Sequence, residues 1–150
     1  MKKIVVWGLC VICLLVLLTG CGSSSNAVVV NKLDPVKLLT KQEAQEALGK
    51  PVKDAEIKEN PTGKICVYSS QDGDSFIQLA LQDKDNAVQI FTDLKTNLKV
   101  TPAPGIGDDA FWAPPGLHVL KSKVYFSIAS GKGGVQELNI KLAKIVLSRL

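Results

Sequence analysis

Short apolar runs that alternate with polar residues recur along the chain, and a period of two is typical of β-strands. The clearest runs lie at 64–70, 75–82 and 124–129, each bordered by turn-forming Gly, Pro, Asp or Ser residues. Shorter strands are expected at 52–59, 109–113 and 117–121. The pattern therefore predicts about six strands joined by short connections.

Apolar residues recur every three or four positions in three other segments, which predicts helices with one apolar face. The first begins with a capping box, Thr40 and Glu43, and ends at Gly49. The second is expected at 85–98, and the third after Gly134. Helices thus precede, separate and follow two groups of three strands.

This order of elements predicts the fold class. Short connections between successive strands favour antiparallel pairing. We expect an α+β domain, with an antiparallel sheet of about six strands and helices packed on one face. One interpretation of the two halves is an αβββ duplication, because 63–67 parallels 116–120 and 75–79 parallels 123–127. The alternative is that two ordinary pairs of hairpins look alike.

The chain begins with a distinct segment. Lys2 and Lys3 precede the apolar run 4–18, which is shorter than the roughly 20 residues of a spanning helix. Leu18-Thr19-Gly20-Cys21 and a Ser-rich spacer follow. This pattern is typical of a removed signal, and it resembles the export signal and lipobox of bacterial lipoproteins. An uncleaved membrane anchor with an incidental cysteine is the alternative.

The resemblance implies a location and a tether. Residues 1–20 would be the signal peptide, 21–37 the lipidated N terminus with a flexible tether, and 38–150 a single domain. Cys21 would carry diacylglycerol, with or without an N-acyl chain, and no other cofactor is expected. Two acyl chains anchor a protein stably. The protein would lie in the cell envelope facing away from the cytoplasm, on the outer membrane if the host has two.

Charge and cysteine content limit the partners and the chemistry. The chain has a formal charge of +4, but Lys2 and Lys3 belong to the signal, and the remaining charges are interspersed. Nucleic acid is therefore not expected as a partner. Of the four cysteines only Cys66 lies in the predicted domain, where its apolar strand favours a buried thiol over a reactive one.

Two segments resemble a pattern of small actinobacterial envelope lipoproteins and some extracellular sensor domains. These segments are Cys66-Val67-Tyr68 and 105–111, which reads Gly-Ile-Gly-Asp-Asp-Ala-Phe. Members of that group often carry a second cysteine able to pair with the first, and this chain lacks it. The resemblance implies a non-catalytic domain that senses a ligand or a partner, and it names no ligand.

The segment around the second motif supplies the candidate site residues. Gly107 permits backbone angles closed to other residues, and Asp108 and Asp109 suit turns. A metal site would combine these aspartates with Asp72 and Asp74, but neither pair has the spacing of a calcium loop. Structural turns are therefore favoured, and no metal is expected.

The remaining candidates are apolar or aromatic. Phe111 and Trp112 stand beside a Pro-Pro-Gly turn, where a core role competes with that of a partner-binding anchor. His118, the only histidine, is expected to point away from its apolar neighbours toward solvent or a cleft. No nucleophile signature accompanies it.

These observations favour a membrane-anchored, non-enzymatic binding or accessory module. Its partner would be an envelope protein or a small ligand. One alternative is a carrier of a lipid or another apolar ligand, which requires an enclosed cavity. The other is an envelope hydrolase that uses Asp108, Asp109 and His118 in a polar pocket.

Overall fold

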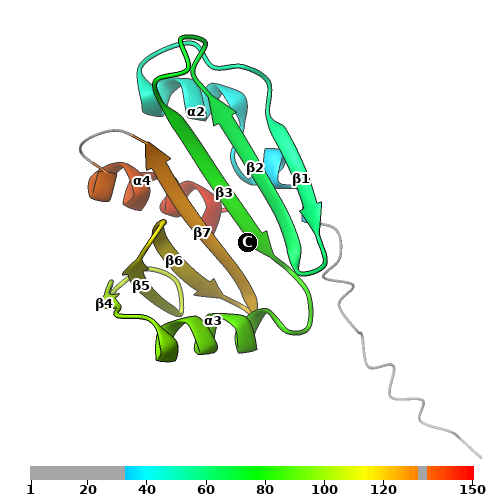
Figure 1. Ribbon diagram of the computed structural model, residues 1–150, viewed down its shortest axis with the longest axis vertical. Helices are drawn as coiled ribbons and strands as arrows, with labels where there is room; N and C mark the ends of the chain where they lie inside the picture. The colour runs from blue at the N-terminus through cyan, green and yellow to red at the C-terminus, as the bar shows by residue number, and fades with distance from the viewer. Residues whose placement is uncertain (1–32, 132–134) are drawn as a thin grey trace, which may run out of the picture.

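The computed structural model describes residues 33–131 and 135–150, and the predicted signal peptide and most of the tether lie outside this part. The elements follow in the order α1 (Pro35–Leu38), α2 (Lys41–Leu48), β1 (Glu56–Asn60), β2 (Gly63–Ser69), β3 (Phe76–Gln82), α3 (Ala87–Asn97), β4 (Thr101–Pro102), β5 (Asp109–Ala113), β6 (Gly116–Lys121), β7 (Val124–Gly131) and α4 (Val135–Leu147) (Figure 1). None of the described helices is both long and apolar enough to span a bilayer.

The strands form one antiparallel sheet in the order β1-β2-β3-β7-β6-β5-β4, which confirms the predicted α+β class. Two meanders, β1-β2-β3 and β5-β6-β7, meet where β3 pairs with β7. The sheet has seven strands rather than about six, because two residues between α3 and β5 pair with β5 as the short edge strand β4.

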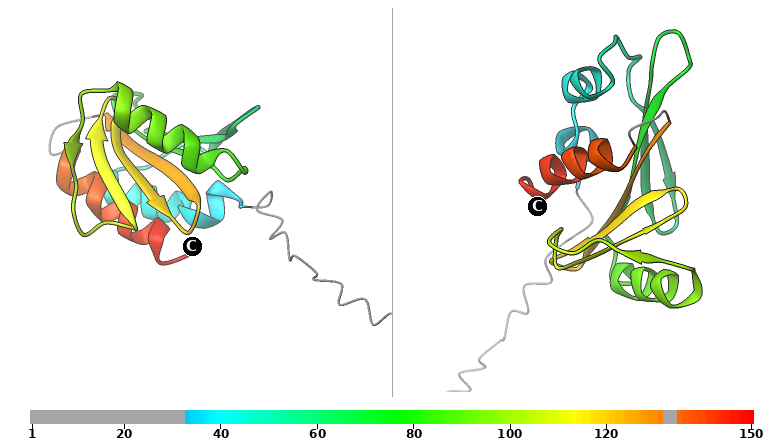
Figure 2. Two further views of the ribbon diagram at one scale, coloured as in Figure 1. Left: turned by 90° about the horizontal axis from the view of Figure 1, so that it is seen from below. Right: turned by 90° about the vertical axis from the view of Figure 1, so that its left-hand side faces the viewer.

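The helices are divided between the two faces of the sheet, whereas we expected them on one. Figure 2 shows α1, α2 and α4 on one side and α3 on the other. The larger core lies under the first three, among Leu79, Phe126 and Leu142. A smaller core lies under α3, where Phe91 packs on Phe111 and Tyr125. The reason is that β5, β6 and β7 carry apolar or aromatic residues on both faces.

The helix predicted from its capping box is confirmed as α2. Thr40 Oγ1 accepts from the Glu43 backbone N–H at 3.3 Å, the Glu43 carboxylate accepts from the Thr40 N–H at 2.9 Å, and Gly49 ends the helix at φ +68°. α1 was not expected. Pro35 in it is buried and Leu33 packs against the core, so residues 33–37 belong to the domain rather than to the tether.

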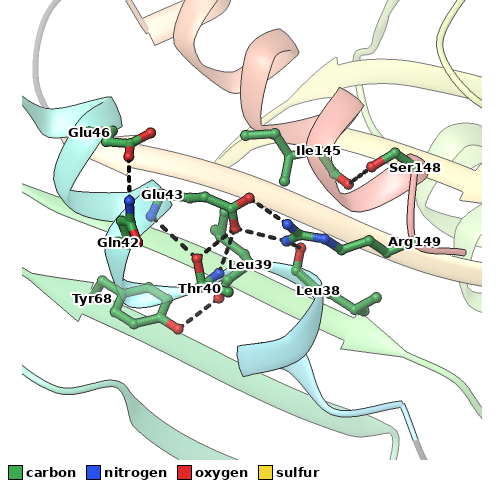
Figure 3. A network of polar contacts seen from close by, with 10 residues as sticks. All are labelled: Leu38, Leu39, Thr40, Gln42, Glu43, Glu46, Tyr68, Ile145, Ser148 and Arg149. Carbon is green, nitrogen blue, oxygen red and sulfur yellow. Dashed lines mark hydrogen bonds and ion pairs between the residues drawn. The ribbon is translucent and has the colours of Figure 1, made fainter.

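The two ends of the domain are held together beside α1 and α2 (Figure 3). The Arg149 guanidinium pairs with the Glu43 carboxylate at 2.5 and 2.8 Å and donates to Leu38 O at 2.8 Å. On the sheet side, the Tyr68 hydroxyl donates to Leu39 O at 2.7 Å. The Arg149 hydrogen bonds hold the pKa of Glu43 at about 2. We call this group the terminal clasp.

The two meanders have corresponding turns. In each, two residues join the first strand to a glycine at which a Cβ would meet a backbone oxygen of the third strand, 1.9 Å away at Gly63 and 2.1 Å at Gly116. The registers, however, match Leu79 with Phe126 rather than with Ser127. The predicted alignment of the third strands was therefore wrong by one residue, and the duplication stays a prediction.

Candidate functional site

The predicted site residues lie on the β5–β6 hairpin and the loop before it, but on different faces. Phe111 is directly opposite His118 in the register, and both side chains lie under α3. Trp112, the next residue, packs against the larger core on the other face. The predicted site residues therefore lie in three separate environments: the loop, the α3 side and the α4 side.

In the loop before β5, Gly107 and Asp108 lie against the end of β6 and the turn that follows it. Gly107 has φ +64°, and a Cβ there would lie 2.6 Å from Leu120 O, so only glycine fits without displacing β6. Asp108 accepts from the Lys121 ammonium at 2.8 Å and from the Ser122 backbone N–H at 2.7 Å. These bonds lower the pKa of the Asp108 carboxyl. Asp108 thus supports the β6–β7 turn, in agreement with the predicted structural role.

Asp109 connects β5 to α3. Its carboxylate accepts from the Lys95 ammonium at 2.5 Å, with about two fifths of each side chain exposed. The pair lies at the border of the smaller core and is open to water. It therefore orients α3 on the sheet and adds little stability by itself.

His118 is enclosed beneath α3, with 3% of its surface exposed. Its Nδ1 lies 2.7 Å from the Tyr125 hydroxyl and its Nε2 lies 3.2 Å from Ala113 O. Because a carbonyl oxygen only accepts, Nε2 carries the proton and Nδ1 accepts from Tyr125. The ring stacks on Phe111 with 4.8 Å between centroids and 9° between planes.

The expectation for His118 was half right. The side chain does point away from Leu117 and Val119, which lie in the larger core. It does not reach solvent or a cleft, because α3 covers it. Burial lowers the pKa of His118 and raises that of Tyr125 to about 12. The sequence did contain one sign of this burial. The apolar stripe of α3 that includes Phe91 requires a second apolar surface of the sheet to pack against.

The three residues of the hydrolase alternative bond to separate partners. Asp108 bonds to Lys121 and Ser122, Asp109 to Lys95, and His118 to Tyr125 and Ala113. His118 is closed off from water while both aspartates are exposed in part. The polar pocket that this alternative required does not join them. Among residues 33–131 and 135–150, no group of three or more His, Cys, Asp or Glu is placed to hold a metal ion.

A groove of about 390 Å³ opens beside Trp112, on the edge of the sheet that β4 forms. The half-buried indole and the exposed Pro114–Pro115 turn give it an apolar wall, and one ammonium and one amide give it polar groups. The residues that line it are Lys99, Thr101, Trp112, Ala113, Pro114, Pro115, Gly116 and Gln136. We call it the Trp112 groove.

The groove combines residues that the sequence did not connect. A binding anchor at Trp112 and the proline turn was one of two roles expected from the sequence, beside core packing, and no role was expected for Lys99, Thr101 or Gln136. Lys99 follows α3, Thr101 begins β4 and Gln136 lies in the first turn of α4, and no motif joins them. A mixed wall of this kind can hold an extended, partly apolar ligand and orient it by hydrogen bonds.

A second hollow, of about 570 Å³, lies along the outward face of α4 and is lined by Glu137, Ile140, Lys141, Lys144, Ile145 and Ser148. It is separate from the predicted site residues. Both hollows lie at the surface rather than between the sheet and its helices.

Comparisons with known proteins leave the chain without an assigned family. No family model matches it, and neither the curated proteins nor the solved structures include a significant match.

Proposed function

We propose that this chain is a membrane-anchored envelope lipoprotein whose domain binds an envelope protein or a small ligand through the Trp112 groove. One observation carries the binding role: a half-buried tryptophan beside two exposed prolines lines an open groove with a lysine and a glutamine. Tryptophan is enriched among the residues that contribute most to binding at protein interfaces.

The proposed location of the protein rests on the sequence. The basic start, the apolar run 4–18 and Leu18-Thr19-Gly20-Cys21 support export, cleavage before Cys21 and diacylglycerol attachment there. The described domain follows after a short tether, and its first helix begins at Pro35. The domain would face away from the cytoplasm.

The binding role is better supported than the two alternatives. A hydrolase would need Asp108, Asp109 and His118 around one pocket, and these residues hold separate structural partners. A carrier of an apolar ligand would need an enclosed cavity, while both described hollows are open at the surface. Binding needs only the exposed groove.

The first test concerns the address. The protein is purified from its own membranes under conditions that retain small molecules, and its intact mass is measured. A chain that begins at acylated Cys21 is expected. An unprocessed chain that begins at Met1 would contradict the proposal, and a co-purified lipid would favour the carrier.

The second test concerns the groove. A photoreactive residue at Thr101 should cross-link the partner in intact cells, and Trp112→Ala should weaken binding by at least about thirtyfold, the loss typical of a central aromatic anchor. Phe76→Ala is the matched control, because Phe76 is an aromatic residue 39% exposed on β3 and does not line the groove. Equal binding by both variants would show that the groove is not the contact surface.

A further inference from the structure

The tether joins the domain on the face of the sheet that carries α1, α2 and α4. Leu33, the first described residue, and Val36 of α1 pack against the larger core, and Arg149 at the end of the chain donates to Leu38 O. Cys21 lies twelve residues before Leu33. Twelve residues span at most about 40 Å when fully extended. A lipid on Cys21 would therefore keep Leu33, where the chain enters the domain on this face, within about 40 Å of the bilayer.

The outward surface of α4 lies on that same face. Leu142, Ala143 and Val146 are fully buried against the sheet. The outward side of the helix presents the exposed Glu137, Lys141, Lys144 and Ser148. Half-buried Ile140 and Ile145 border this polar strip on either side and also pack against the larger core.

This composition matches the boundary between lipid headgroups and acyl chains. Lysine stems lie along apolar surface while their ammonium groups reach phosphates, and each lysine near an anionic membrane contributes about 1 kcal/mol. Glu137, one turn before Lys141, is the acidic residue of the surface. The other side of the sheet, by contrast, carries α3, whose last-turn Lys95 is paired with Asp109.

We propose that the outward face of α4, from Ile140 to Ser148, docks on the anionic surface of the membrane that holds the lipid anchor. The proposal rests on the proposed lipidation of Cys21, because the tether makes docking an intramolecular step. A short flexible linker gives an effective concentration in the millimolar range, so a weak surface suffices. The Trp112 groove, which β4 and the β5–β6 turn line, lies at the edge of the sheet and would stay open when α4 docks.

The test uses the full chain with its lipid, reconstituted in vesicles of phosphatidylcholine with phosphatidylglycerol. A fluorophore is attached at Ile140→Cys or, as the matched control, at Val88→Cys, both in a Cys66→Ala background. Val88 is 39% exposed on α3, across the sheet from α4. Nitroxide-labelled phospholipids then report which label reaches the membrane. We expect strong quenching at position 140 and weak quenching at position 88.

A charge reversal sharpens the test. Lys141→Glu with Lys144→Glu should lower the docking equilibrium at least about fivefold per position, because each change removes an attracted charge and adds a repelled one. Replacing phosphatidylglycerol with phosphatidylcholine should also weaken docking. Lys53→Glu with Lys58→Glu makes the same change in charge at the β1 edge and should leave quenching unchanged. Both sets of proteins are first compared in urea unfolding, so that a loss of folding is not mistaken for a loss of docking.

The outcomes separate this inference from the proposed function. If the intact mass shows no acyl group on Cys21, the proposed function fails and docking fails with it. If Cys21 is acylated but positions 140 and 88 are quenched alike, docking alone is overturned. The same holds if quenching at position 140 is insensitive to both the lysine reversal and the lipid charge, since α4 would then face another partner or solvent.

Discussion

The two meanders of the sheet have the same connections but different environments. In β3, Ile77, Leu79 and Leu81 are fully buried while Gln78 and Ala80 between them stay partly exposed. In β7, every residue from Val124 to Ser130 is buried. The difference arises because α3 covers the open face of the second meander only, so β5-β6-β7 lies between two layers of helix.

This comparison shows what a second layer does to polar residues. On the open face of the first meander, Gln78 can bond to water. In the second meander, His118 and Tyr125 occupy the corresponding side of the sheet, and each is buried with the other as a partner. A buried polar group without such a partner would cost about 1–3 kcal/mol. Fewer kinds of residue can therefore be accepted at the covered positions of the second meander than at the open positions of the first.

The largest expected effect comes from removing the cover of the second meander. Phe91→Ala takes out a ring that is 2% exposed and packs 4.9 Å from Phe111 and 5.6 Å from Tyr125. It should lower the free energy of unfolding by about 3–5 kcal/mol. The comparison is Val67→Ala on the open face of β2, expected to cost about 1 kcal/mol or less. Urea unfolding measures both, and similar losses would refute the difference between the halves.

A second effect tests the buried histidine. Its folded-state pKa is lowered by burial, so the unfolded chain takes up the proton first as the pH falls. Stability should be complete above the unfolded pKa of about 6.5 and decrease below it. Urea unfolding between about pH 7.5 and pH 5 should show this slope, and His118→Gln should flatten it.

Tyr125→Phe tests the hydrogen bond to His118 while the packing of both rings is kept. This variant keeps the ring of Tyr125 but leaves Nδ1 of His118 without its donor, and should cost about 1–3 kcal/mol. A slope that persists unchanged in His118→Gln would assign the pH dependence to another group.

The smallest effect concerns the terminal clasp, which holds α1 and α2 over the first meander at the surface. Arg149→Met should cost about 1 kcal/mol or less, because the pair is exposed in part. The Glu43 pKa is lowered from 4.5 to about 2, so this stability is present above about pH 4.5 and is lost as the pH falls toward 2. Lys41→Met, which breaks a more exposed pair with Asp54, should have almost no effect in the same assay.

Local signals in the sequence were sufficient for most of the elements. The Thr40–Glu43 capping box, the glycine after α2 and the apolar stripe of α3 each act within a few residues, and each was found. β4 was missed because two residues with a proline carry no strand pattern. α1 was missed because a single turn is too short to show an apolar period, although Asp34 caps it and Pro35 occupies its first position.

Long-range packing explains what the sequence did not yield. The alternation in β6 predicted the direction of His118, but the layer that buries it comes from α3, whose position on the sheet no local pattern fixes. The Trp112 groove has the same property. Trp112 and the proline turn were visible as a pair, whereas Lys99 and Gln136 join them only because β4 and α4 both begin at the same edge.

The terminal clasp also has a mechanical meaning. If Cys21 is held in a membrane, any pull on the domain enters at Leu33 and reaches α1 first. The Leu38 and Leu39 carbonyls are bonded to Arg149 and to Tyr68, so the load passes to the segment after α4 and to the end of β2 together. Detaching α1 would break these two bonds and expose the buried Pro35 and Leu38, while the strands of the sheet would keep their pairing. The domain would thus gain a few residues of extra tether under tension without losing its binding groove.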